Sequence, residues 1–402
     1  MSCHHDARGL TNLRTSSELG WGLIFILFSY LTACAPIPTA QPQRTVAMDP
    51  VAAFKLRVER LCEGHDIPGL SLAVLRRQQV LFAQGFGYAN IEKKIPATPD
   101  TPYNIASLTK PFSAAVLMKL VEEGRLDLDA ELAVLLAKKE FWRGQHFTGY
   151  SEACREIKKA RRNPFFPYPS LIRNYRCDSE RITVRHHLTH TAQGVPGENY
   201  RYNGFLFGFL SSVAEMASGK DFDQMLVETI IAPLGMRRTI PSWDGELRHR
   251  ILAERAAYYR KGLFGFVPSE YRTRLSASAG MVSTVMDLAT FDMAMDRDLI
   301  LSRESKEAMF TATRSNRGKR LPYGLGWFVQ EHKDMKLVWH YGHAPKAYSS
   351  LILKCLDRKS TLILLANSDG LSAAFSLGAG DVLKSPFALA FLEFIAGMDA
   401  AS

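Results

Sequence analysis

The sequence predicts a mixed α/β (α+β) fold, in which one antiparallel sheet flanked by helices is built from both chain ends and interrupted by an inserted all-α domain. Strand-like apolar runs occur at residues 70–75 and 80–83 and return only after residue 325. From Gly124 to about Pro241 the signals are those of helices and loops. This order predicts a cleft between sheet and insertion, a place that favours an active site.

The N-terminal elements follow from hydrophobic periodicity. Residues 50–63 have a helical pattern, and the runs at 70–75 and 80–83 are two strands joined by a polar turn at 76–79. Residues 104–110 then open a long apolar helix that extends to about Glu123. Gly124 ends that helix.

The C-terminal part supplies the other strands, at residues 326–329, 337–339, 350–353 and 361–365, and a final helix at 386–397. We therefore divide the chain into a leader (1–33), a tether (34–49), a first α/β part (50–125), a helical insertion (126–264) and a second α/β part (265–402). No internal repeat is found.

Composition places the chain among ordinary globular proteins, with 402 residues, 47% hydrophobic and 22% charged. The formal charge of +10 includes one basic run, formed by Lys158, Lys159, Arg161 and Arg162. Such a run could meet nucleic acid or anionic lipid, but no nucleic-acid-binding motif accompanies it. We interpret it as a solvated surface that faces an anionic envelope and expect no nucleic-acid partner.

The first residues resemble a bacterial lipoprotein signal. Arg8 and Arg14 precede an apolar stretch at 20–32, which is short for a membrane span, and Leu31-Thr32-Ala33 lead into Cys34. The resemblance implies lipidation of Cys34, with residues 35–48 as a flexible tether. It predicts a lipid-anchored protein in a bacterial cell envelope, facing the periplasm. A plain secretory signal or a misplaced start codon are the alternatives.

The remaining cysteines fit an exported protein. Cys154 and Cys177 flank one irregular segment, and an oxidising periplasm could join them in a disulfide. Cys62 and Cys355 lie in apolar surroundings and are expected to be buried thiols. Cys3 would be removed with the leader, so no metal site is expected there.

The first candidate for chemistry is the sequence Ser107-Leu108-Thr109-Lys110. Residues three apart share a helix face, so the Lys110 amine can approach the Ser107 hydroxyl. A serine becomes a good nucleophile when a neighbouring group takes its proton, and desolvation can lower a lysine pKa enough for that task. A serine at a helix start can also offer its own N–H to a developing oxyanion.

Two further segments could complete the site. A tyrosine phenolate such as that of Tyr202, beside a lysine that lowers its pKa, can act as general base. In Trp339-His340-Tyr341-Gly342-His343, a strand edge can present a second oxyanion N–H, and His340 can supply a polar or cationic group. Taken singly, a tyrosine in such a loop usually serves packing, and a lone histidine in an apolar strand is more often structural.

In this order, Ser-x-x-Lys, a tyrosine motif and His-x-Gly resemble the serine β-lactamase and penicillin-binding-protein superfamily. The similar branch is the class C-related one, which includes esterases and D-amino-acid peptidases. The resemblance runs from about Val51 to Asp369 and includes 182–191, 233–239, 278–284 and 323–327. It implies a β-lactamase/transpeptidase-like fold, and a structural role for the histidines at 186, 187 and 190 in place of a metal site.

The resemblance also implies a role for each matching residue. Ser107 is the nucleophile, Lys110 its activating partner, and Tyr202 the general base and later proton donor. The N–H groups of Ser107 and His343 are the implied oxyanion hole, and His340 and Gly342 shape the opposite wall. No metal or organic cofactor is implied.

The chain departs from the family pattern at two positions. The usual motif is Tyr-x-Asn, in which the asparagine contacts a substrate amide. Gly204 holds that place here, and Asn203, one residue earlier, is kept as a candidate substrate contact. His340 stands where lysine is common. Both departures favour the esterase-like members.

Three functional readings remain open. The first is a serine hydrolase of esters or small amides that forms an acyl-enzyme on Ser107. The second is a D,D-peptidase or weak β-lactamase acting on peptidoglycan-like substrates. The third is a non-catalytic envelope-binding lipoprotein, for which the long basic insertion at 138–179, with Phe165, Phe166 and Tyr168, would be a lid or partner surface. The sequence does not indicate the oligomeric state.

Overall fold

The computed structural model describes residues 48–137, 150–165, 169–179, 181–241, 246–271 and 273–400. The leader and the proposed lipidation site Cys34 lie outside these residues, as do Lys138, Lys139, Phe166 and Tyr168 of the insertion. Within the described part of the chain, no helix combines the length and the apolar character that a membrane span needs.

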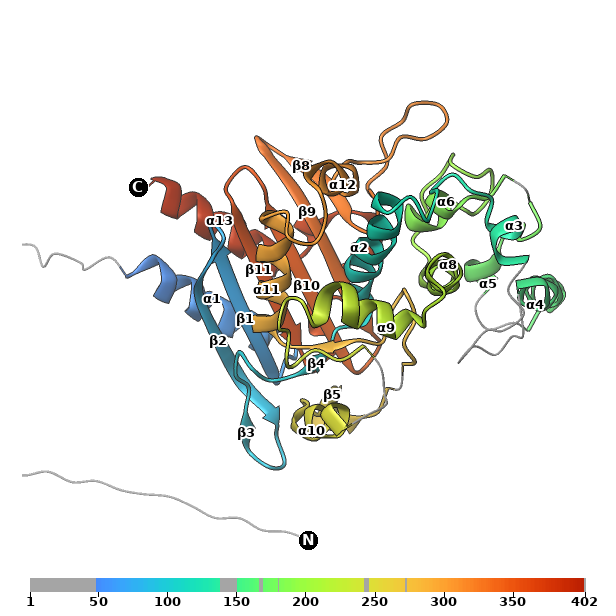
Figure 1. The fold of residues 1–402 in the computed structure, drawn as a ribbon. Coiled ribbons are helices and arrows are strands. Elements are labelled where there is room, and N and C mark those ends of the chain that lie inside the picture. The colour runs from blue at the N-terminus through green and yellow to red at the C-terminus, as the bar shows by residue number, and fades with distance from the viewer. Residues whose placement is uncertain are drawn as a thin grey trace, which may run out of the picture. The chain divides into compact units, whose positions relative to one another are not determined.

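The sheet has seven strands in the order β3-β2-β1-β11-β10-β9-β8 and joins the two ends of the chain, as predicted (Figure 1). The N-terminal strands are β1 (Gly69–Arg76), β2 (Gln79–Asn90) and β3 (Ile95–Pro96), and the C-terminal strands are β8 (Phe328–His332), β9 (Met335–Ala344), β10 (Tyr348–Cys355) and β11 (Ser360–Ala366). All neighbours are antiparallel. The halves meet where β1 pairs with β11, with Leu70 opposite Ala366.

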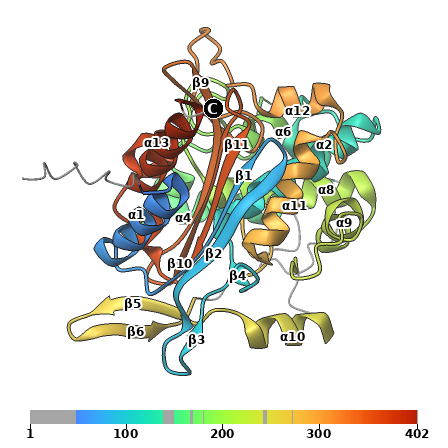
Figure 2. The same ribbon diagram turned by 90° about the vertical axis from the view of Figure 1, so that its left-hand side faces the viewer.

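Helices cover both faces of the sheet (Figure 2). Helices α1 (Pro50–Gly64) and α13 (Pro386–Ala400) lie on one face, and α2 (Thr109–Glu122) and α11 (Val285–Asp296) lie on the other. Because successive strand residues point to opposite faces, Leu72 joins the core with α1 and α13 while Ala73 joins the core with α2 and α11. A strand buried on both faces explains the continuous apolar run of β1.

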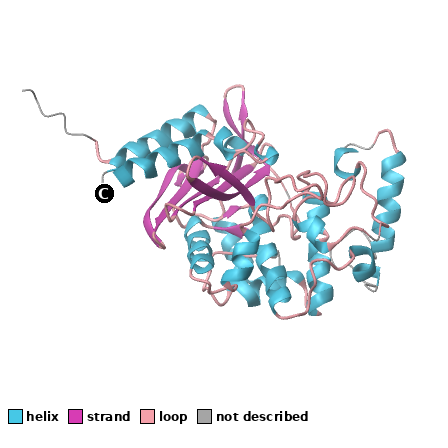
Figure 3. Ribbon diagram, turned by 90° about the horizontal axis from the view of Figure 1, so that it is seen from above, coloured by secondary structure: helices cyan, strands magenta, loops and turns pink. Residues whose placement is uncertain are grey.

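Beyond α2 the described chain is mainly helical until the hairpin formed by β5 (Tyr258–Gly262) and β6 (Gly265–Ser269) (Figure 3). Its helices are α3 (Leu132–Ala137), α4 (Tyr150–Arg162), α5 (Pro169–Ile172), α6 (Val184–Leu188), α7 (Gly204–Gly208), α8 (Leu210–Ser218), α9 (Phe222–Leu226), the π-helical η2 (Val227–Ile231) and α10 (Glu246–Glu254).

The short elements that remain are β4 (Tyr103–Asn104), which pairs with β7 (Val282–Ser283), helix α12 (Arg303–Met309), and the 3₁₀ turns η1 (Ala106–Leu108), η3 (Asp369–Leu371), η4 (Leu377–Ala379) and η5 (Val382–Lys384). The predicted domain boundary at 264/265 falls in the turn of the β5–β6 hairpin. Residues Met48–Ser402 form one compact unit.

The cysteines behave as the sequence suggested. Cys154 and Cys177 form a disulfide with Cα atoms 5.6 Å apart, which ties α4 to the segment before α6. Cys62 and Cys355 are free and buried, as predicted.

One buried charge cluster fastens α11 to the sheet. Lys354 Nζ of β10 lies 2.5 Å from Asp292 Oδ1 and 2.9 Å from Asp296 Oδ1. The two carboxylates raise the pKa of Lys354 although burial opposes them. Removing one partner would leave an uncompensated buried charge, so this cluster fixes how α11 packs.

Candidate active site

Ser107 lies in η1, which leads directly into α2. The turn is sharp because Ala106 has a φ of +49°, in the left-handed region that non-glycine residues avoid. Two side chains hold this backbone, since Ser350 Oγ donates to the Ile105 carbonyl at 2.7 Å and Thr109 Oγ1 donates to the Ala106 carbonyl at 2.8 Å. Ser107 is thereby presented, half-buried, at the start of α2.

Lys110 is the group best placed to activate Ser107. Its Nζ is 2.8 Å from Ser107 Oγ and 2.9 Å from the carbonyl oxygen of Ser278. The side chain is completely buried, and this burial lowers the pKa of Lys110 well below its ordinary value. A neutral amine in this position can accept the Ser107 proton. The three-residue spacing therefore brings these two groups together as predicted.

Tyr202 also lies at this centre, but in a different protonation state from the predicted phenolate. Lys110 Nζ is 5.1 Å from the centroid of the Tyr202 ring. Burial raises the pKa of Tyr202 well above its ordinary value, and the nearby Tyr341 raises it further, whereas Ser107 lowers it. Lys110 is not among the groups that lower the pKa of Tyr202, so burial decides the direction of the shift. Tyr202 thus carries its proton at neutral pH.

The Tyr202 hydroxyl is a buried donor without an acceptor. Ser107 lies near enough to lower the pKa of Tyr202 through a hydrogen-bonding contact, yet no described residue meets the Tyr202 oxygen with the distance and angles of a regular hydrogen bond. An unsatisfied buried hydroxyl is costly unless a ligand or water completes it. This geometry suits a proton donor to a substrate atom that arrives beside Ser107.

His340 is neutral and fully buried. The Tyr341 carbonyl can only accept, so the contact of 2.8 Å places the proton on His340 Nδ1, and Nε2 accepts from the Tyr323 hydroxyl at 2.9 Å. Burial lowers the pKa of His340 well below its ordinary value, and Lys110 lowers it further. Of the polar and cationic roles that the sequence left open, the structure favours the polar one. Both ring nitrogens bind protein atoms, so His340 holds its neighbours in place and leaves no nitrogen for substrate.

Gly342 allows β9 to lie against the turn that carries Ser107. A Cβ on Gly342 would be 2.3 Å from the Ile105 carbonyl oxygen and 3.0 Å from the Ala106 Cβ, so only glycine fits. The next residue, His343, is exposed, and its Nε2 is 3.9 Å from Asp369 Oδ2. This close approach brings β9 and the η1 turn together. That the N–H groups of Ser107 and His343 form the oxyanion hole remains a prediction.

We expect Gly342→Ala to lower kcat/KM for any substrate of Ser107 by about 100-fold, because a shift of 1 Å in a reacting group can cost that much. Overpacking should also reduce the free energy of unfolding by about 2 kcal/mol. Gly64→Ala is the matched control, since a Cβ there meets no atom within 4 Å. Equal activity of both variants would show that β9 need not approach the turn.

Asn203 was a candidate substrate contact, and the structure contradicts this. It is buried and caps α7, where its Oδ1 accepts from the Leu206 N–H at 3.0 Å. Its Nδ2 donates to the Leu171 carbonyl at 2.7 Å and to Gln193 Oε1 at 2.8 Å. Because these bonds use both ends of the amide, Asn203 has a structural role.

Two residues of the site have contacts that the sequence did not predict. Ser278 accepts a hydrogen bond from Lys110, and Tyr323 donates one to His340. Both belong to stretches that matched family landmarks, but nothing in their spacing showed what they would contact.

The neighbouring histidines are engaged within the fold. His187 Nδ1 is 2.7 Å from the Leu206 carbonyl and its Nε2 is 3.0 Å from the Tyr175 hydroxyl. His186 Nδ1 bonds to Thr183 at the start of α6. These contacts agree with the structural role that the resemblance implied for His186 and His187, whereas His190 accepts from the Asn203 N–H at 3.1 Å through Nδ1 and its buried Nε2 has no hydrogen bond to a described residue.

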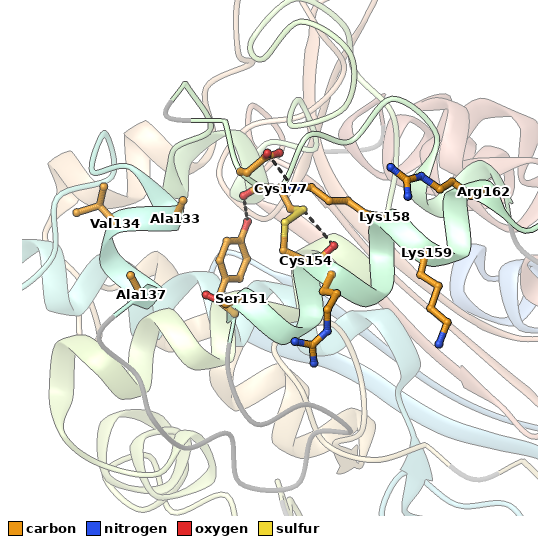
Figure 4. Close-up of a pocket in the computed structure, with 12 residues that line it drawn as sticks. Ala133, Val134, Ala137, Ser151, Cys154, Lys158, Lys159, Arg162 and Cys177 are labelled. Carbon is orange, nitrogen blue, oxygen red and sulfur yellow. Dashed lines mark hydrogen bonds and ion pairs between the residues drawn. A yellow bond between two sulfur atoms is a disulfide. The ribbon is translucent and has the colours of Figure 1, made fainter.

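A separate hollow lies in the helical insertion, away from Ser107 (Figure 4). It has a volume of about 910 Å³ and is bordered by Ala133, Val134, Tyr150, the Cys154–Cys177 disulfide and the basic side chains of α4. Two cations of the basic run have carboxylate partners, since Lys158 is 2.8 Å from Asp178 and Lys159 is 3.8 Å from Glu156. The basic run of the sequence is thus partly neutralised on the surface of α4.

Comparison with known proteins agrees with this geometry. The family model described as Beta-lactamase matches residues 54–382. "Penicillin-binding protein 4*" of Bacillus subtilis is 26% identical over 362 residues, covering 77% of this chain and 70% of the relative. The "D-aminopeptidase" of Gluconobacter oxydans is 26% identical over 307 residues, covering 75% of this chain but only 56% of that protein.

Among solved structures, the octameric penicillin-binding protein homologue from Pyrococcus abyssi has a TM-score of 0.65 and 25% identity. The match covers 85% of this chain and 77% of that one. The sheet and its flanking helices are therefore those of a known fold.

Proposed function

Because the chain belongs to the Beta-lactamase family, we propose that it is a serine hydrolase that forms an acyl-enzyme on Ser107 and cleaves esters or small amides. The observation that carries this proposal is the contact of 2.8 Å between Lys110 Nζ and Ser107 Oγ. The lysine in that contact has a depressed pKa. Nucleophile and base are thus in reach of each other before any substrate binds.

In the first step, Ser107 Oγ attacks the substrate carbonyl carbon while its proton passes to Lys110 Nζ. The carbonyl oxygen becomes an oxyanion, which we place at the N–H groups of Ser107 and His343. The tetrahedral intermediate then collapses, the bond to the leaving group breaks, and the Tyr202 hydroxyl gives that group a proton. A proton shift from Lys110 to Tyr202 restores both residues, and water releases the acyl group by the same steps in reverse order.

Two observations support esters over peptides. Gly204 offers no side chain to hold a substrate amide, and both nitrogens of His340 are used within the protein. An ester also has a better leaving group, so it demands less of a single proton donor. The names of two relatives, "Penicillin-binding protein 4*" and "D-aminopeptidase", support the second candidate, a D,D-peptidase or weak β-lactamase.

We also propose that the protein is anchored in a bacterial envelope through lipid on Cys34. The sequence 31–34 supports this, and the Cys154–Cys177 disulfide is typical of an oxidising compartment. Labelled palmitate should be incorporated into the full chain when it is made in a bacterium that processes lipoproteins, and a Cys34→Ala variant should lose the label. Equal labelling of both would contradict this anchor.

The activity is tested by trapping the acyl-enzyme. The purified protein is mixed with p-nitrophenyl acetate, nitrocefin or a D-alanyl amide, and its intact mass is measured within the first turnover. We expect release of p-nitrophenol and a gain of one acetyl group on the peptide that contains Ser107. A lasting adduct with nitrocefin alone would favour the second candidate. If no reagent acylates the folded protein, the binding-lipoprotein alternative takes its place.

A further inference from the structure

Neither the backbone conformation nor the packing at position 204 requires a glycine. It is the first residue of α7, and its φ is not in the left-handed region where glycine is favoured. A Cβ built there would meet its nearest neighbours at 3.7 Å, an ordinary van der Waals distance. Since glycine weakens a helix relative to alanine, the missing side chain needs another explanation.

The space that Gly204 leaves open borders the reaction centre. The two atoms nearest to the absent Cβ are Lys110 Nζ and Ser278 Oγ, both at 3.7 Å. Lys110 Nζ is in turn 2.8 Å from Ser107 Oγ. Any side chain at 204 would therefore begin within reach of the catalytic pair, and its absence leaves room for part of a substrate.

The direction of this space identifies the part of the substrate. Three groups surround the carbonyl carbon that Ser107 attacks. In the proposed mechanism the oxygen lies at the N–H groups of Ser107 and His343, and the leaving group lies at the Tyr202 hydroxyl, which has no regular hydrogen bond to a described residue. The third group, the acyl substituent, is left with the side formed by Gly204 and Ser278.

Ser278 offers one unused hydrogen-bond donor on that side. Its Oγ lies 3.5 Å from Ser276 Oγ, which donates to it, while its own proton has no acceptor among the described residues. The Ser278 side chain is only partly buried. An acceptor atom on the substrate can therefore complete this hydroxyl.

The charge of the centre limits what that acceptor can be. Burial alone lowers the pKa of Lys110, and no described carboxylate counteracts it. An ammonium next to the substrate carbonyl has no lone pair to accept the Ser278 proton and would lack a counter-charge there, and a carboxylate would likewise lack one when Lys110 is deprotonated. The site is thus suited to an uncharged oxygen.

We propose that Gly204 and Ser278 form an acyl-side subsite, in which Ser278 donates a hydrogen bond to an uncharged oxygen on the carbon next to the scissile carbonyl. The preferred substrates are then α-hydroxyacyl or α-alkoxyacyl esters. This inference rests on the proposed function, since it needs acylation of Ser107.

The test compares p-nitrophenyl methoxyacetate with p-nitrophenyl butyrate, which have equal length and differ by an oxygen in place of a methylene. The ratio of their kcat/KM values is measured in the parent and in Ser278→Ala, so that intrinsic reactivity cancels. Loss of one hydrogen bond should reduce this ratio by about 3- to 10-fold. Ser151→Ala removes an exposed hydroxyl on α4 and should leave the ratio within about 2-fold of the parent.

A side chain that fills the space beside Gly204 should slow the hydrolysis of every ester whose acyl group carries a substituent. Gly204→Ala should lower kcat/KM for p-nitrophenyl methoxyacetate and p-nitrophenyl butyrate by about 10-fold more than for p-nitrophenyl formate. The added methyl group would occupy part of the space beside residue 204, and formate has no acyl substituent. Gly208→Ala on the same helix is the matched control, since its Cβ would meet Ser276 at 3.8 Å and does not approach Lys110.

The outcomes separate this inference from the proposed function. Turnover that labels Ser107, with an unchanged substrate ratio in Ser278→Ala, overturns the subsite alone. Absence of turnover and of any acyl adduct in the parent overturns the proposed function and the subsite together. A lower ratio in Ser278→Ala, but not in Ser151→Ala, supports both.

Discussion

The Ser107→Ala variant should hydrolyse p-nitrophenyl acetate at least about 10⁴-fold more slowly than the parent, because removal of a nucleophile abolishes the covalent pathway. Lys110 Nζ has one hydroxyl within hydrogen-bonding distance among the described residues, that of Ser107. Ser278 Oγ is a second hydroxyl near Lys110, and it borders the open space beside Gly204. Initial rates measured at equal protein concentration, with the uncatalysed rate subtracted, give the comparison.

Ser151→Ala is the control for that loss, since Ser151 is an exposed serine on α4, far from the reaction centre. The far-ultraviolet circular dichroism of both variants should match the parent. If Ser107→Ala keeps more than a tenth of the parental rate, the nucleophile lies elsewhere and the proposed mechanism is wrong.

The Lys110→Met variant should lose about 10²- to 10⁴-fold in kcat/KM, the usual contribution of a general base. In the parent, kcat/KM should fall as the pH falls through the depressed pKa of Lys110, because the ammonium cannot take the Ser107 proton. The kcat/KM of Lys110→Met should not show this fall at low pH. Lys119→Met removes a more exposed lysine of the same helix, paired with Glu122 at 3.3 Å, and should keep it.

The same variant should change how stability depends on pH. The pKa of Lys110 is lower in the folded than in the unfolded protein, so between these two values the unfolded chain binds the extra proton. The free energy of unfolding of the parent should therefore rise with pH up to about 10.5, by at most about 1.4 kcal/mol per pH unit. In Lys110→Met this rise should be absent.

Urea denaturation at pH 7 and pH 9 measures that difference, with Lys119→Met as the reference for loss of an exposed lysine. Parallel pH dependence in the parent and in Lys110→Met would mean that Lys110 is charged in the folded state. Lys110 would then have to lose its proton before it could act as the base.

Motifs of closely spaced residues were predictable because local geometry decides them. Ser107 and Lys110 are three residues apart at a helix start, and the structure places their side chains 2.8 Å apart. The pattern of Asn203 was equally visible, but the prediction of a substrate contact was wrong. Its amide is used by α7 and by Leu171 and Gln193, and the latter two contacts depend on packing.

The sequence by itself determined the strands at both chain ends, the helical insertion, the order of the motifs and the Ser-x-x-Lys pair, because hydrophobic period and short spacing act locally. Only the tertiary structure decided the protonation of Tyr202 and His340, since burial outweighs the charges that the sequence suggested. It also decided the contact of Lys110 with Ser278 and the open space beside Gly204, which join segments far apart in the chain. Desolvation and long-range contacts exist only once the core has formed, and for this reason no sequence pattern could reveal them.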